Sequence, residues 1–418
     1  MSVAEEPLVP STGDAGRGVA PAGSAARSGI VVAAGMAAAN LLGYAFNMVG
    51  ARVLGPADYG ALGALLGLVL IGSVAALALQ AVVARQVAVT QAADGPSPGA
   101  RLLVRQGVRA GLAVGGVALL ASPLVTYGLR LDGPAPALWL AAGLVPLTMI
   151  GMLQGYLQGT ERFGALAVVF LVAAAGKVGG GLIGLALVPS PTAAMAGMAV
   201  CSVLAVLVGW RVVAAAAGSA PDVAAGSVAE LLAAGQSLLL LLALTNTDVL
   251  LARRFLDEHD AGLYAVGAVV AKGAYWLPQF VAVLAFPRLA DPDRRRHAAG
   301  IAVALVFALG VLTTAVVAVA PRVVVLAVGG AEYAQLSGQV ALFAAAGSSF
   351  ALAQLLLYSR LATHDRQASV SLIVGLAVLV GVVVLWLHDS VTQIVAASMG
   401  VALFVCVVGL LAELREHR

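Results

Sequence analysis

The sequence predicts an all-α polytopic membrane protein. We expect about twelve transmembrane helices in two six-helix lobes, related by a pseudo-two-fold axis along the membrane normal. Three observations predict this fold: an apolar composition, apolar runs of spanning length, and an echo between the two halves. Of the 418 residues, 61% are hydrophobic and 10% are charged, whereas soluble proteins carry about 25% charged residues. A soluble enzyme of this length needs more charged side chains than this to keep its surface hydrated. The chain is therefore expected to lie in lipid.

Each predicted helix is an apolar run close to the ~20 residues that cross the hydrocarbon of a bilayer. The preceding segment 1–27 is rich in Ala, Gly, Pro and Ser and is predicted to be a disordered cytoplasmic tail. Segment 321–334 is interpreted as a loop or a short re-entrant element. The predicted helices cover 28–50, 59–89, 104–127, 136–159, 164–187, 192–214, 235–256, 262–287, 298–320, 337–361, 367–387 and 391–412.

The distribution of arginine predicts the orientation. With the N-terminus in the cytoplasm, 16 of the 23 basic residues fall on the cytoplasmic side and 5 on the outer side. An excess of basic residues marks the cytoplasmic loops of membrane proteins, so both termini are predicted to be cytoplasmic. The remaining two basic residues are Lys177 and Lys272, the only lysines of the chain, and both fall in the middle of a predicted helix.

The two halves of the chain contain matching residues at a nearly constant offset. Tyr59 and Tyr264 are 205 residues apart, as are Cys201 and Cys406, and two Arg-bearing loops match at an offset of 204. Because six helices is an even number, two such units enter the membrane in the same direction, with a cleft between them. The predicted divisions are an N-terminal lobe at 28–217, a cytoplasmic linker at 218–234 and a C-terminal lobe at 235–418.

Several classes of function are disfavoured. The net charge is only +3 and no basic run stands out, so a nucleic-acid partner is not expected. Cys201 and Cys406 lie in apolar stretches and are interpreted as core residues, and five scattered histidines form no ligand cluster. We therefore expect no metal and no cofactor. With neither a Walker lysine motif nor paired carboxylates in a water-facing domain, the sequence predicts no catalytic residues and no enzyme.

Five segments occur in an informative order. They are Arg52-Val-Leu-Gly-Pro-Ala-Asp-Tyr-Gly60, Gln154-Gly-Tyr-Leu-Gln-Gly-Thr-Glu-Arg-Phe163, Thr247-Asp248, Ala261-Gly-Leu-Tyr264 and Phe286-Pro287. From about residue 30 to the end, the chain resembles the polysaccharide (oligosaccharide) flippase family of the multidrug/oligosaccharidyl-lipid/polysaccharide exporter superfamily.

That resemblance implies two six-helix lobes in a V shape. It also implies a lipid-linked oligosaccharide substrate on a polyprenyl (undecaprenyl) pyrophosphate carrier. The substrate would cross the bacterial inner (plasma) membrane from the inner to the outer leaflet, for cell-surface polysaccharide biosynthesis. Polysaccharide polymerase and glycosyltransferases are the implied protein partners.

Other membrane-protein classes are weighed against this resemblance. Lipid II flippases of the same superfamily typically have fourteen helices, and the predicted twelve argue against them. Major facilitator transporters have twelve, but the loop at 90–101 lacks their Asp-Arg-rich motif. An ion-coupled small-molecule or drug antiporter of the superfamily and a non-transporting membrane scaffold remain the alternatives.

Lys177 and Lys272 are the first candidates for the substrate cavity. A charge at the centre of a spanning helix costs about 2.5–3.5 kcal/mol on the insertion scale, so both are expected to face protein or a watery cavity. The functional interpretation is that they bind a diphosphate or an acidic sugar; the alternative is a structural charge pair. Tyr275, Trp276 and Gln279 share the face of Lys272, and either bind sugar and phosphate or pack at the lobe interface.

Asp248 is the only acid placed well inside a predicted helix, with Asn246 beside it. Its carboxylate is a candidate for a structural or gating pair with Lys272, for coupling to a proton or sodium ion, or for direct contact with substrate.

Polar stripes and terminal arginines complete the candidates. Asn40, Tyr44 and Asn47 form a stripe on the first helix, and Gln154 and Gln158 form one on the fourth. Both stripes either line a cavity or bridge helices. Arg85 is a candidate for the entering diphosphate or a cytoplasmic anchor. The last candidates are Arg52, Arg253 and Arg254. They either form an outer gate or anchor the protein at the membrane interface.

Overall fold

The computed structural model describes residues 22–92, 100–216, 228–289, 295–361 and 366–416, and these residues form helices and short turns without any strand. The elements are α1 (Ala22–Gly72), α2 (Val74–Ala92), α3 (Ala100–Gly128), α4 (Ala135–Gly159), α5 (Phe163–Leu187), α6 (Pro191–Ala216), α7 (Val228–Phe255), α8 (Glu258–Leu289), α9 (Arg295–Val319), α10 (Pro321–Val328), the 3₁₀ helix η1 (Ala331–Gly338), α11 (Val340–Leu361), α12 (Arg366–Leu385) and α13 (Val391–Glu416).

The helix α1 contains two spans. At Gly55 the backbone takes φ +69° and ψ 176°, a conformation that glycine adopts without strain, and Pro56 follows. The two arms fold back on each other, since the Tyr59 hydroxyl donates to Asn47 Oδ1 at 3.0 Å. The second arm continues into α2 after an interruption at Ser73. Together α1 and α2 therefore form the first two predicted spans.

The other ten predicted spans correspond one to one to α3–α9 and α11–α13. By length and hydropathy alone, seven described helices could cross a membrane, or eight when the bent pair η1–α11 counts as one span. Segment 321–334 is not an irregular loop, because most of it belongs to α10 and η1.

The boundaries of two predicted segments need correction. α1 begins at Ala22, inside the expected tail, and α7 begins at Val228, inside the expected linker. Most of the predicted disordered tail (1–21) and part of the predicted linker (217–227) lie outside the described residues.

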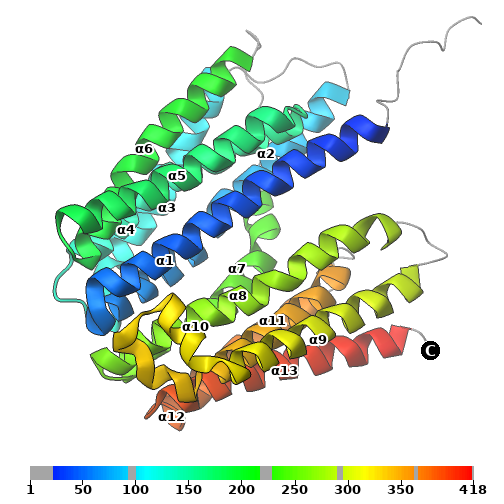
Figure 1. The fold of residues 1–418 in the computed structure, drawn as a ribbon. Coiled ribbons are helices and arrows are strands. Elements are labelled where there is room, and N and C mark those ends of the chain that lie inside the picture. Colours follow the sequence, from blue (N-terminus) through cyan, green and yellow to red (C-terminus); the bar gives the residue numbers. More distant parts are fainter. Residues whose placement is uncertain (1–21, 93–99, 217–227, 290–294, 362–365, 417–418) are drawn as a thin grey trace, which may run out of the picture.

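The helices form two lobes in a V shape (Figure 1). α1 to α6 make one lobe and α7 to α13 make the other. The lobes meet at the bend of α1, near α10, which we call the closed end. They diverge toward the open end, where α1 begins and α13 ends. Between the lobes, α1 packs along α7 and α8, and α2 packs against α7.

The surface has the features of a lipid-facing protein. Large apolar side chains are exposed along the outer helices, among them Leu120 at 84% and Leu124 at 73% on α3. Tyr127, Trp139 and Trp386 are exposed near the closed end, and Trp210 is exposed near the other end of α6. Exposed Trp and Tyr side chains typically mark the two membrane–water boundaries.

Candidate functional site

A cavity of about 390 Å³ lies between the two lobes. Its walls come from α1, α2, α4, α5 and α6 on one side and from α7, α8, α11 and α13 on the other. Its volume is in the range of small-molecule sites, about 300–1,000 Å³.

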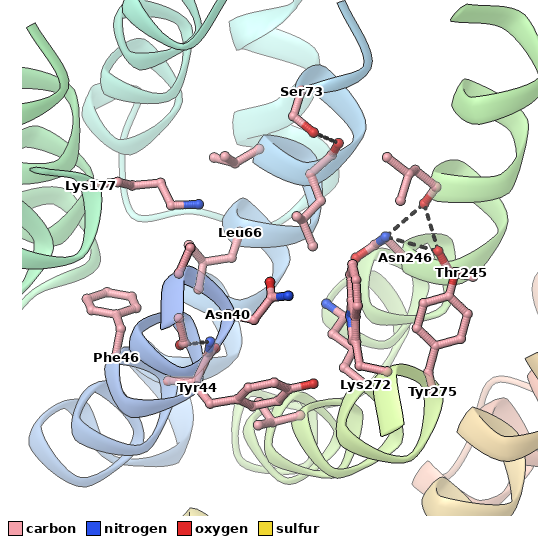
Figure 2. A pocket seen from close by; sticks show the side chains of 18 of the residues that line it. Asn40, Tyr44, Phe46, Leu66, Ser73, Lys177, Thr245, Asn246, Lys272 and Tyr275 are labelled. Carbon is pink, nitrogen blue, oxygen red and sulfur yellow. Dashed lines mark hydrogen bonds between the residues drawn. The ribbon is translucent and has the colours of Figure 1, made fainter. Parts of the chain in front are cut away.

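Each lobe contributes one lysine to this cavity. Lys177 extends from α5 and Lys272 from α8, and the two side chains enter the space around Asn40 from opposite sides (Figure 2). Within the part of the chain that the structure describes, neither ammonium forms an ion pair or a hydrogen bond. Among the described residues, the two ammonium groups of the cavity therefore have no carboxylate within ion-pair distance.

Asp248 also lines the cavity, but hydroxyl groups hold its carboxylate. Oδ2 accepts a hydrogen bond from Tyr264 at 2.9 Å and one from Ser398 at 3.4 Å. The Asp248 carboxylate is close enough to Lys272 to interact electrostatically, yet it makes no ion pair with it among the described contacts. The direct Asp248–Lys272 pair considered from the sequence is absent here, because the carboxylate instead joins α7 to α8 and α13.

Two buried polar atoms of the cavity have no hydrogen-bond partner among the described residues. They are Asn246 Oδ1 and the Tyr44 hydroxyl. The Asn246 amide nitrogen is satisfied, since it donates to the Leu242 carbonyl at 2.8 Å. Because buried polar groups in proteins are usually paired, these two atoms are available to a ligand or to water.

The structure brings most of the other sequence-predicted candidates to the same cavity. The further lining residues from that set are Asn40, Asn47, Gln154, Tyr275 and Trp276.

Two of the candidates for the cavity wall, Gln158 and Arg85, do not line it. Gln158 is exposed near the end of α4 and accepts a hydrogen bond from Gln80 Nε2 at 3.0 Å, because one further helical turn carries it past the cavity wall. Arg85 is exposed on α2 and is not among the lining residues. The side chain of Gln279 lies outside the described residues.

Sequence reasoning missed several polar lining residues. Ser73, Gln80 and Ser202 belong to the cavity wall and were not among the candidates. Each is a polar residue within an apolar stretch of the sequence, the same signal that singled out Asn40 and Gln154.

The closed end is held by arginines that bind backbone carbonyls across the lobes; we call Arg52, Arg130 and Arg253 the closed-end clamp. Arg52 donates to the carbonyl oxygens of Leu326 and Ala327 at 3.2 and 2.5 Å. Arg130 donates to Arg253 O at 3.0 Å and to Leu256 O.

Arg253 is the centre of this clamp. It is 4% exposed and donates to the carbonyls of Leu129 at 3.0 Å and Ala57 at 3.2 Å. It also donates to Arg130 O at 3.2 Å and pairs with Glu258 at 3.6 Å. Arg254 instead stacks over the Tyr127 ring, 5.4 Å from its centroid.

Arg253→Ala is expected to lower the free energy of unfolding by about 3 kcal/mol, the order of losing two charge-assisted hydrogen bonds. Thermal unfolding of the purified protein in detergent measures this loss. Arg322→Ala is the matched control, because Arg322 lies on α10 at the same end and is exposed. Equal midpoints for the two variants would contradict the clamp.

The described helices thus form two lobes around a central cavity that contains several polar side chains. No family model and no curated protein matches the chain. Solved structures do match. The lipid II flippase MurJ in an inward closed conformation has a TM-score of 0.70 at 10% identity, covering 92% of this chain and 87% of that chain.

Two further structures show the same fold. An inward-facing multidrug-resistance MATE family transporter of the MOP superfamily has a TM-score of 0.61 at 14% identity, covering 90% of this chain and 94% of that chain. A MOP superfamily transporter from Pyrococcus furiosus has a TM-score of 0.54 at 15% identity, covering 93% and 94%. The chain therefore has the fold of the multidrug/oligosaccharidyl-lipid/polysaccharide exporter superfamily.

Proposed function

We propose that the chain is a flippase that moves a polyprenyl-pyrophosphate-linked oligosaccharide across the bacterial inner membrane by alternating access. The observation that carries the proposal is the pair Lys177 and Lys272, one from each lobe, which line one cavity and form no ion pair with any described residue. An anionic head group compensates these charges, whereas an organic cation adds to them.

The cost of burying charge favours this pairing for both partners, the lysines and the diphosphate. Each lysine at the centre of a spanning helix costs about 2.5–3.5 kcal/mol on the insertion scale. A diphosphate crossing the hydrocarbon alone faces a much larger penalty. In the cavity the ammonium groups supply charge-assisted hydrogen bonds to the diphosphate, and the unpaired Asn246 Oδ1 and Tyr44 hydroxyl accept from or donate to sugar hydroxyls.

The arginine distribution supports an opening toward the cytoplasm. Arg52, Arg130 and Arg253 lie at the closed end, and they belong to the basic minority that the sequence assigns to the outer side. On this orientation both termini are cytoplasmic and the V opens inward. The glycan and its diphosphate enter the cavity from the cytoplasm while the polyprenyl tail stays in lipid.

Translocation then requires the lobes to exchange which end is closed. The closed-end clamp must release its carbonyl contacts, and the open end must close. No covalent bond is made or broken in this cycle. This role needs two kinds of protein partner. They are glycosyltransferases that build the glycan before translocation and a polymerase that uses it afterwards.

An ion-coupled small-molecule antiporter is the second candidate, because MATE transporters share the fold and Asp248 lies in the cavity. We assign Asp248 a structural role, since hydroxyls from α8 and α13 already bind its carboxylate.

Asp248→Asn is expected to retain export within about twofold of wild type, because the amide oxygen still accepts the hydrogen bonds from Tyr264 and Ser398. Replacing the charged acceptor by a neutral one costs only about 1 kcal/mol. Asp248→Leu keeps no acceptor and is expected to lower the unfolding midpoint. Export by both variants is measured with and without an imposed proton or sodium gradient. A wild-type dependence on the gradient that disappears in Asp248→Asn would favour the antiporter.

Deletion of the gene tests the flippase proposal in the cell. We expect lipid-linked glycan to accumulate in the inner leaflet, measured by its accessibility to an impermeant glycan-modifying enzyme on either side of the membrane. Unchanged outer-leaflet glycan in a strain without a redundant flippase would contradict the proposal.

A further inference from the structure

A second hollow lies at the closed end, apart from the central cavity, with a volume of about 670 Å³. The end of α3 and the turn before α4 form one wall, with Ser122, Thr126, Tyr127 and Arg130. Arg254 of α7 reaches it from the other lobe. Two guanidinium groups from different lobes therefore border one pocket.

Among the described residues, no carboxylate forms an ion pair with the arginines of this pocket. Arg130 donates to the carbonyls of Arg253 and Leu256, and Arg254 packs on the Tyr127 ring. Among the described contacts, neither guanidinium pairs with a carboxylate. The acids at this end, including Glu258 and Asp132, interact with Arg253 instead.

The pocket lies where the apolar surface of α3 ends. Leu120 and Leu124 expose 84% and 73% of their surface along α3, and Tyr127 exposes 74% at the pocket itself. An exposed tyrosine next to lipid-facing leucines is typical of the membrane–water boundary. A cationic pocket above an apolar track matches a phospholipid, whose phosphate lies at that depth and whose chains run along the helix.

We infer that this pocket binds the phosphate of an anionic phospholipid from the leaflet at the closed end. Guanidinium groups bind phosphate oxygens with charge-assisted hydrogen bonds. Because Arg130 and Arg254 belong to different lobes, the bound lipid bridges them. It therefore stabilises the state in which this end is closed, as any ligand of one state does. The inference does not depend on which substrate crosses the membrane.

Binding of short-chain phosphatidylglycerol to the purified full chain in detergent tests the inference. Arg254→Gln is expected to weaken binding by roughly tenfold, the loss that follows when a charge-assisted hydrogen bond is removed. Arg322→Gln, at the same end but outside the pocket, should bind as wild type does. Short-chain phosphatidylcholine and inorganic phosphate should bind much more weakly than phosphatidylglycerol.

Three results would overturn the site. Equal binding of phosphatidylglycerol by wild type and Arg254→Gln removes Arg254 from it. Equal binding of phosphatidylcholine indicates unspecific lipid contact, and equal binding of inorganic phosphate indicates a free-ion site. Should Arg254→Gln not fold, the salt dependence of binding by the unmutated protein replaces it. Binding that is insensitive to salt contradicts a site built on two guanidinium charges that border a surface pocket.

Discussion

Lys272→Met is expected to reduce export of lipid-linked glycan roughly tenfold or more while leaving the protein folded, since a charge-assisted hydrogen bond contributes about 1.5–3 kcal/mol. Met keeps the length of the side chain and removes the charge. Because the ammonium has no directly paired counter-ion among the described residues, its removal also removes a desolvation cost. The unfolding midpoint is therefore expected to stay the same or rise as export falls.

A fall in export without a fall in stability indicates that the lysine contacts substrate, whereas loss of a structural charge would lower stability as well. Lys272→Arg keeps the charge and is the matched control, with most of the export retained. Lys177→Met should behave like Lys272→Met, because Lys177 occupies the facing wall of the same cavity. Export is measured as outer-leaflet glycan at equal protein levels. Full export by Lys272→Met would remove this residue from the mechanism.

Gly262→Ala is expected to force the closed end open. A Cβ atom at Gly262 would lie 2.0 Å from the carbonyl oxygen of Pro56 in the bend of α1. The backbones of the two lobes therefore approach this closely only because the residue is glycine. A clash that costs about 1.4 kcal/mol shifts the equilibrium between the closed and the open state about tenfold. The population that is open at this end should therefore rise about tenfold or more.

The shift is measured as labelling of Leu66→Cys, in the cavity wall, by an impermeant thiol reagent on the closed-end side. Cys201→Ser and Cys406→Ser remove the native thiols from the background. Gly273→Ala is the control on the same helix, because nothing lies within 4 Å of its Cβ position. Equal labelling rates in the two glycine variants would contradict a gate at this crossing.

The spans and much of the cavity could be predicted from the sequence because each has a local signature. Apolar runs of membrane length gave the helices. A lone lysine, or the Asn40 stripe, in such a run is costly unless it faces a cavity or another helix. These patterns depend only on nearby residues and on the solvent, so they hold before the fold is known.

The closed-end clamp could not be predicted in the same way. Arg52 and Arg253 were candidates for a gate, but their acceptors are backbone carbonyls, which every residue carries and which therefore leave no pattern in the sequence. Arg130 was missed for the same reason. The close approach of Gly262 to Pro56 and the outward position of Gln158 likewise depend on how helices cross, which local periodicity does not fix.

The most direct test of the flippase proposal uses the purified protein in proteoliposomes. A lipid-linked diphosphate glycan is added to one leaflet, and its appearance in the other is followed with an impermeant glycan-modifying enzyme. The proposal predicts rapid translocation by wild type, slow translocation by the double variant Lys177→Met, Lys272→Met, and no uptake of organic cations. Transport of an organic cation without translocation of the lipid-linked glycan would contradict it and favour the antiporter.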